Sequence, residues 1–134
     1  MKEKIVASGK RKRSKARAVI YEGTGEVTVN KISYKFLPEI HRLIIEEPLR
    51  IAKEVLGNLN YNIEASWNGG GVEAGIEACR LAIARALIKA TKSKKLEQAF
   101  RKYDRSLVVA DTRIKEAYKP NDSKARAKRQ KSYR

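Results

Sequence analysis

Few side chains in this sequence have the types and spacing that covalent chemistry needs. The single histidine, His41, has no cysteine or second histidine near it in sequence, so the pattern disfavours a metal site there. The single cysteine, Cys79, falls within an apolar helical stripe, where cysteine behaves as a small core residue. Glu46 and Glu47 are adjacent on a predicted helix, so their carboxylates point in different directions. No Ser/His/Asp or Cys/His set can be assembled, and the sequence predicts a protein that is not an enzyme.

Three consecutive glycines, Gly69, Gly70 and Gly71, stand between a predicted strand and a predicted helix. Glycines at such a junction let backbone N–H groups approach a phosphate, and the start of a helix favours an anion. The segment lacks the Lys-Ser/Thr ending of a P-loop, and GGGVEAG does not have the dinucleotide-binding spacing. A kinase-like site for a nucleoside phosphate is therefore disfavoured. Contact with an RNA phosphate and a purely structural tight turn both stay open.

Two clusters of cations stand near the two ends of the chain. The first comprises Lys10, Arg11, Lys12, Arg13, Lys15 and Arg17, and the second comprises Lys124, Arg126, Lys128, Arg129, Lys131 and Arg134. The whole chain has 31 Lys and Arg against 15 Asp and Glu, which gives a net charge of +16. The first cluster alone could be a strand edge guarded by charge. Two clusters with this net charge indicate a nucleic-acid partner.

The segment 123–134 has no acidic residue and no aliphatic side chain larger than alanine. It cannot bury enough apolar surface to offset the entropy of ordering it, so we expect it to order only against a polyanion. Tyr118 and Tyr133 could stack on a base or a sugar. We therefore predict a globular domain over residues 1–110 and an extended basic tail over residues 111–134.

A membrane location is disfavoured. No run approaches the roughly 20 apolar residues of a spanning helix. The first twelve residues, MKEKIVASGKRK, contain no apolar core of a secretory signal, and a lone cysteine fits a reducing compartment. We expect a cytoplasmic protein without a cofactor.

The first third of the chain favours strands. Ser8 and Gly9 suggest a loop. Residues 16–21 and 26–29 suggest two strands that are joined as a hairpin through the glycines at 23 and 25. Asn30-Lys31 then suggests a second turn, which is followed by a short strand over residues 32–36. Residues 38–56 suggest a helix that ends at Gly57, in one piece or in two, because Pro48 can break or restart it.

The middle of the chain has clearer periodicity. Tyr61, Ile63, Ala65 and Trp67 alternate with polar residues, which predicts a half-buried strand over residues 61–67. Residues 72–90 have an apolar stripe at helical spacing, with further apolar residues opposite it, so we expect a helix covered from two sides. Ser93 is a predicted N-cap for a last helix, whose apolar face carries Leu96, Phe100 and Tyr103. These elements give an α+β class.

Four stretches together resemble one known family. They are SGKRKRSKARA at 8–18, GGGVEAGIEACRLAIARAL at 69–87, KYDRSLVV at 102–109 and KARAKRQKSYR at 124–134. This combination resembles the ninth protein of the small ribosomal subunit in its archaeal and eukaryotic branch, over nearly the whole chain. Basic arms are common, but a glycine-led helix of small residues between them is specific.

The resemblance implies a mixed sheet with helices packed on one face and a left-handed βαβ unit like that in the second domain of ribosomal protein S-five. It implies binding to the ribosomal RNA of the subunit head through the N-terminal cations, the glycines 69–71 and the earlier tail cations. Carried over by position, Lys131 and Arg134 would contact the transfer RNA in the peptidyl site, with Tyr133 between them as a further candidate for this contact. Neighbouring head proteins would be further partners, and an architectural DNA-binding protein is the alternative.

Overall fold

A computed structural model describes residues 3–134 of the chain. Its sheet contains β1 (Ile5–Arg11), β2 (Ser14–Glu22), β3 (Val27–Val29), β4 (Ile32–Ser33) and β5 (Tyr61–Asn68). Its helices are α1 (Glu39–Leu56), α2 (Val72–Thr91) and α3 (Lys94–Tyr103), with short 3-10 turns η1 (Tyr34–Phe36) and η2 (Arg105–Leu107). The α+β class is confirmed.

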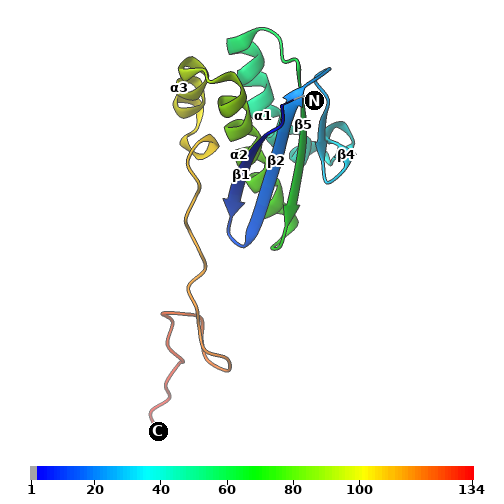
Figure 1. Cartoon of the computed structure of the whole chain (residues 1–134). Helices are drawn as coiled ribbons and strands as arrows, with labels where there is room; N and C mark the ends of the chain where they lie inside the picture. Colours follow the sequence, from blue (N-terminus) through cyan, green and yellow to red (C-terminus); the bar gives the residue numbers. More distant parts are fainter. Residues whose placement is uncertain (1–2) are drawn as a thin grey trace.

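The five strands form one mixed sheet in the order β1-β2-β5-β3-β4. The helices lie on one face of it, and no described helix crosses the other face, which we call the open face (Figure 1). Ala16, Ala18 and Ile20 of β2 point toward α2 and are buried, whereas Lys15 and Arg17, which alternate with them, are exposed on the open face. Strand alternation therefore separates core residues from cations within a single segment.

The prediction of a loop at Ser8 and Gly9 is wrong. Both residues lie inside β1, which pairs with β2 in an antiparallel hairpin that turns at Lys12 and Arg13. Gly9 is needed there because β1 passes very close to α2. A Cβ on Gly9 would lie 2.2 Å from the carbonyl oxygen of Ala78 and 2.8 Å from the amide nitrogen of Ala82. The glycine permits close packing, not a loop.

The predicted hairpin between residues 16–21 and 26–29 is also wrong. The two strands form, but β5 lies between them, antiparallel to β2 and parallel to β3. A parallel pair needs a crossover, and the chain makes it through β4, η1 and α1. The turn at Asn30 and Lys31 is confirmed, with φ angles of 49° and 69°. Only Ile32 and Ser33 of the predicted third strand are extended, since the chain then enters η1.

The helices agree closely with the sequence pattern. α1 is a single helix that ends at Gly57 (φ 81°), and Pro48 is buried inside it without dividing it. α2 is covered by the sheet on one side and by α1 and α3 on the other, as predicted. Ser93 caps α3 by accepting a hydrogen bond from the amide of Leu96, and Leu96 and Phe100 are buried. Tyr103, predicted on the same face, is mostly exposed.

After η2 the chain forms no further helix or strand up to Arg134. This segment runs away from the helices and beyond the tip of the β1–β2 hairpin (Figure 1). From residue 111 onward its residues are exposed apart from Asp111 and Ser123.

Candidate nucleic-acid interface

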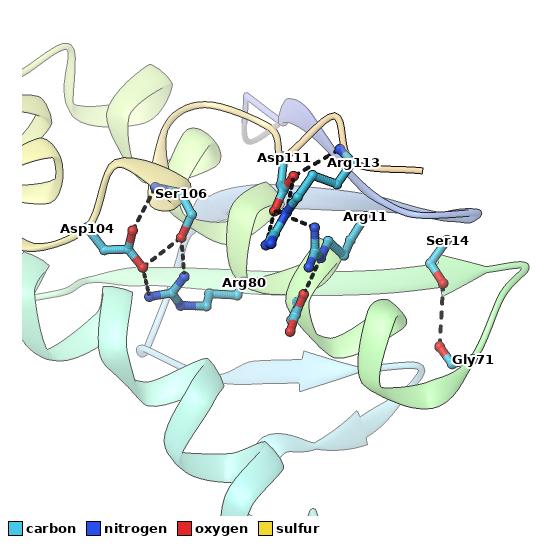
Figure 2. A network of polar contacts seen from close by, with 9 residues as sticks. Arg11, Ser14, Gly71, Arg80, Asp104, Ser106, Asp111 and Arg113 are labelled. Carbon is cyan, nitrogen blue, oxygen red and sulfur yellow. Dashed lines mark hydrogen bonds and ion pairs between the residues drawn. The ribbon is translucent and has the colours of Figure 1, made fainter. Parts of the chain in front are cut away.

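The tip of the β1–β2 hairpin rests on the glycine turn that precedes α2. The side chain of Ser14, which is fully buried, donates a hydrogen bond of 2.8 Å to the carbonyl oxygen of Gly69, and its oxygen lies 3.4 Å from that of Gly71 (Figure 2). Gly69 and Gly70 have φ angles of 76° and 66°, a region in which glycine has no steric penalty. A Cβ on Gly70 would also meet the Ser14 oxygen at 2.3 Å. The first two glycines therefore build a structural turn.

Gly71 differs from its two neighbours. Its φ of −90° is open to any residue, and a Cβ there would meet no atom within 4 Å. It is the N-cap residue of α2, yet no side chain caps the helix at this position. The first N–H groups of α2 thus adjoin an open space beside the hairpin cations, so the local geometry leaves the phosphate interpretation open at Gly71 alone.

The turn between β3 and β4 brings one further cation, Lys31, to this end of the sheet. The Asn30 side chain accepts a hydrogen bond of 3.1 Å from the amide of Trp67, and the Asn30 amide donates to the carbonyl of Ala65 at 2.9 Å. Asn30 thereby continues the β3–β5 ladder and fixes Lys31 beside the end of β5. Lys31 was not predicted as a site residue, although the Asn30-Lys31 turn that carries it was predicted from the sequence.

Arg11 differs from the other cations of its cluster because the fold already uses it. Its guanidinium donates to Glu77 of α2 at 2.6 Å and forms an ion pair with Asp111, and only 17% of its side chain is exposed (Figure 2). Arg113 also donates to Asp111, and Arg113 first and Arg11 second hold the pKa of the Asp111 carboxyl well below its usual range. These contacts attach the root of the tail to the hairpin.

Two arginines of α2 also hold the chain before the tail. Arg80 donates to Glu47 at 2.6 Å, to Asp104 at 3.1 Å and to Ser106 at 3.0 Å. Hydrogen bonds from Ser106, aided by Arg80, lower the pKa of Asp104. Arg85 joins the carbonyl oxygens of Ser8 and Val108, both at 3.0 Å, so β1, α2 and η2 are tied together.

The remaining hairpin cations have no such partners. The residues Lys10, Lys12, Arg13, Lys15 and Arg17 are exposed, and none of their side chains forms a hydrogen bond or ion pair with another described residue. Like charges also face each other there, since Lys10 is the cross-strand partner of Lys15. Facing cations cost stability in a sheet, which a bound polyanion would relieve.

The tail cations divide in the same way. Arg126 pairs with Glu116 at 3.0 Å and Arg129 with Asp122 at 3.4 Å, and Lys124 lies 3.8 Å from the centre of the Tyr118 ring. These pairs are solvent-exposed and therefore weak. Lys128, Lys131 and Arg134 have no described partner, and Tyr133 is 90% exposed.

The residues considered for catalysis have structural surroundings. Cys79 is fully buried, and burial raises the pKa of its thiol to about 12. Glu46 pairs with Arg42 and Arg50, whereas Glu47 pairs with Arg80, so the two carboxylates do point apart. His41 Nε2 lies 2.7 Å from Glu73 and links the first turns of α1 and α2.

Comparison with known proteins identifies the family. Residues 9–134 match the family described as ribosomal protein S9/S16. The chain belongs to the ribosomal protein S9 family. Small ribosomal subunit protein uS9 of Thermoplasma volcanium is 41% identical over 131 residues, which cover 97% of this chain and 98% of the relative. Small ribosomal subunit protein uS9 of Thermoplasma acidophilum is 44% identical over 131 residues, which cover 97% and 100%.

Membership of the S9 family confirms the predicted archaeal-type ribosomal protein, a structural and non-enzymatic constituent of the small subunit that resides with the ribosome in the cytoplasm. It favours neither the DNA-binding alternative nor a kinase-like one. Within residues 3–134, no helix has the length and apolar character needed to cross a bilayer.

Proposed function

We propose that this S9-family chain binds ribosomal RNA of the subunit head through its hairpin and extends its tail to the transfer RNA in the peptidyl site. The observation that carries the proposal is the convergence of the hairpin tip, the open start of α2 and the root of the tail at one end of the molecule (Figure 1). The parallel pair of β3 and β5 also supports the S-five-like βαβ unit, whose left-handed crossover is part of the proposal.

The RNA surface consists of the exposed, unpaired cations of the hairpin with Gly71 beside them. Arg11 has a different role, because its two carboxylate partners commit it to holding the tail root. Phosphates that meet Lys12 and Arg13 at the tip would also reach the first N–H groups of α2, where an anion is favoured. Lys124, Arg126, Lys128 and Arg129 would then continue along the RNA beyond the hairpin.

The end of the tail is suited to a partner far from the globular part. Fully extended, the last twelve residues reach about 40 Å. Three side chains there have no competing partner within the described chain. They are the ammonium group of Lys131, the exposed ring of Tyr133 and the guanidinium group of Arg134. Neighbouring head proteins would find exposed apolar side chains at Phe36 and Ile40, which are 83% and 69% exposed.

Binding of a small-subunit RNA fragment at several salt concentrations tests the hairpin. Replacing Lys12 and Arg13 with alanine should reduce the slope of log affinity against log salt by about 0.9 for each phosphate that the protein no longer neutralises. Lys94→Ala with Lys95→Ala is the matched control, since these exposed lysines begin α3 at the other end of α2. Equal reductions in the two variants would mean that only net charge matters, and the hairpin proposal would be wrong.

Replacement of Lys128, Arg129, Lys131 and Arg134 by glutamine tests the tail. The melting temperature should not change because these side chains are exposed and outside the core. Small subunits reconstituted with this variant should hold peptidyl-site transfer RNA more weakly, with a shallower salt dependence, while a deletion of residues 128–134 should do the same. Normal retention of transfer RNA at all salt concentrations would contradict the tail proposal.

A further inference from the structure

The open face of the sheet is hollowed over β5. The hollow has a volume of about 540 Å³, and Arg17, Val19, Tyr21, Thr28, Lys31 and Ser66 are among the residues that line it. This volume falls within the range of about 300–1,000 Å³ that is usual for small-ligand sites. Other hollows of the surface are of similar size, so its chemistry distinguishes it.

Four polar side chains of the hollow are uncommitted. The side chains of Arg17, Thr28, Lys31 and Ser66 make no hydrogen bond or ion pair with any other described residue. Arg17 is the cross-strand partner of Ser66 on β5, and Lys31 is fixed on the opposite side by the Asn30 ladder. Two cations therefore flank a hydroxyl at the end of the hollow that adjoins the hairpin tip, which is an arrangement suited to a phosphate.

The other end of the hollow has a different character. Val19 provides an apolar floor next to Tyr21, whose hydroxyl donates a hydrogen bond of 2.8 Å to Glu64. This bond raises the pKa of the Tyr21 phenol and holds its ring in place. Glu26 and Glu64 make this end unfavourable for a phosphate, whereas a base with N–H groups can approach a carboxylate there.

We infer that the hollow on the open face takes one unpaired ribonucleotide of the RNA, with its phosphate between Arg17 and Lys31 and its base against Val19 and Tyr21. A base can enter only after it has left its helical stack, because the faces of a stacked base are covered by its neighbours in the duplex. The hydroxyls of Ser66 and Thr28 face the ribose. The inference rests on the proposed RNA-binding function and adds a binding site for a nucleotide to it.

The test compares two short RNAs, one fully paired duplex and the same duplex with a single bulged nucleotide. The unchanged protein should bind the bulged RNA at least tenfold more tightly at equal salt. Ser66→Glu puts a carboxylate between the two cations and should remove that difference, and Arg17→Gln should reduce it. Gln98→Glu makes the same change of charge at an exposed position of α3, and it should leave the preference for the bulged RNA intact.

Three results separate the possibilities. Loss of the bulge preference in Ser66→Glu but not in Gln98→Glu supports the nucleotide site. Equal preference in both variants, or no preference in the unchanged protein, overturns it. The Lys12→Ala, Arg13→Ala protein is measured in parallel. If it binds both RNAs as tightly as the unchanged protein, the proposed function is refuted. If it binds them more weakly while Ser66→Glu keeps the preference for the bulged RNA, only the nucleotide site is refuted.

Discussion

Replacement of Gly9 by alanine gives the sharpest test of how the basic hairpin is held. The new Cβ would lie 2.2 Å from the Ala78 carbonyl oxygen and 2.8 Å from the Ala82 amide nitrogen, both in the backbone of α2. Neither atom can rotate away, so β1 must move from the helix. Such overpacking costs typically about 1–3 kcal/mol, and a rigid backbone contact belongs in the upper part of that range.

The sign of the effect decides between two interpretations. In an exposed loop, alanine would be neutral or stabilising, since it loses less conformational entropy than glycine. In β1 it should lower the free energy of unfolding by about 2–3 kcal/mol and the melting temperature by about 10 °C. Thermal and urea unfolding followed by circular dichroism measure both quantities, in salt that screens the charge of +16.

Gly71→Ala is the matched control for this experiment. Its φ is −90°, and its Cβ would meet nothing within 4 Å, so the substitution introduces no clash. The entropy that alanine saves in the unfolded chain opposes its lower preference at an N-cap, so the free energy of unfolding should change by less than about 1 kcal/mol. A Gly9→Ala protein as stable as Gly71→Ala would refute the close approach of β1 to α2. The contacts of Arg85 with β1 and η2 would then have to be placed differently as well.

Two further predictions concern titration and reactivity. The folded-state pKa of Asp104 is depressed below its unfolded value of about 3.9, so its contribution to stability is present above about pH 4 and is lost as the pH falls through the folded pKa. Urea unfolding at several pH values should show that Asp104→Asn destabilises the protein at neutral pH and flattens the acid limb, and parallel curves for the two proteins would contradict this. Cys79, fully buried with its pKa raised to about 12, should react with a thiol reagent at pH 8 only at the rate of opening, and urea should accelerate the reaction greatly. Immediate labelling of the native protein would show that the thiol is accessible.

The periodic elements could be predicted because their signals are local. The alternation of Ile63 and Ala65 with polar residues sets β5, and the small and apolar residues of α2 set a helix buried on two sides. The terminal cations and the irregular tail follow from composition alone, since a segment without apolar side chains has no means of packing. Family membership was also readable, because the glycine-led helix between two basic arms is a specific combination.

What the sequence could not determine depends on contacts between distant residues. A glycine at position 9 is compatible with a loop and with a strand. Only the close contact between β1 and α2 explains why no larger residue fits there. β2 and β3 are adjacent in sequence, yet β5 separates them because α1 carries the chain back in parallel.

The site shows the same division. Composition counts the cations but cannot tell which of them already have partners. In the tertiary structure Arg11 forms ion pairs with Glu77 and Asp111. The side chains of Arg17 and Lys31 have no partner among the described residues, and they lie on two sides of one hollow. The sequence therefore determined that the chain carries a large excess of positive charge, and the packing of α2 against the hairpin decided which of these charges have no partner within the described residues.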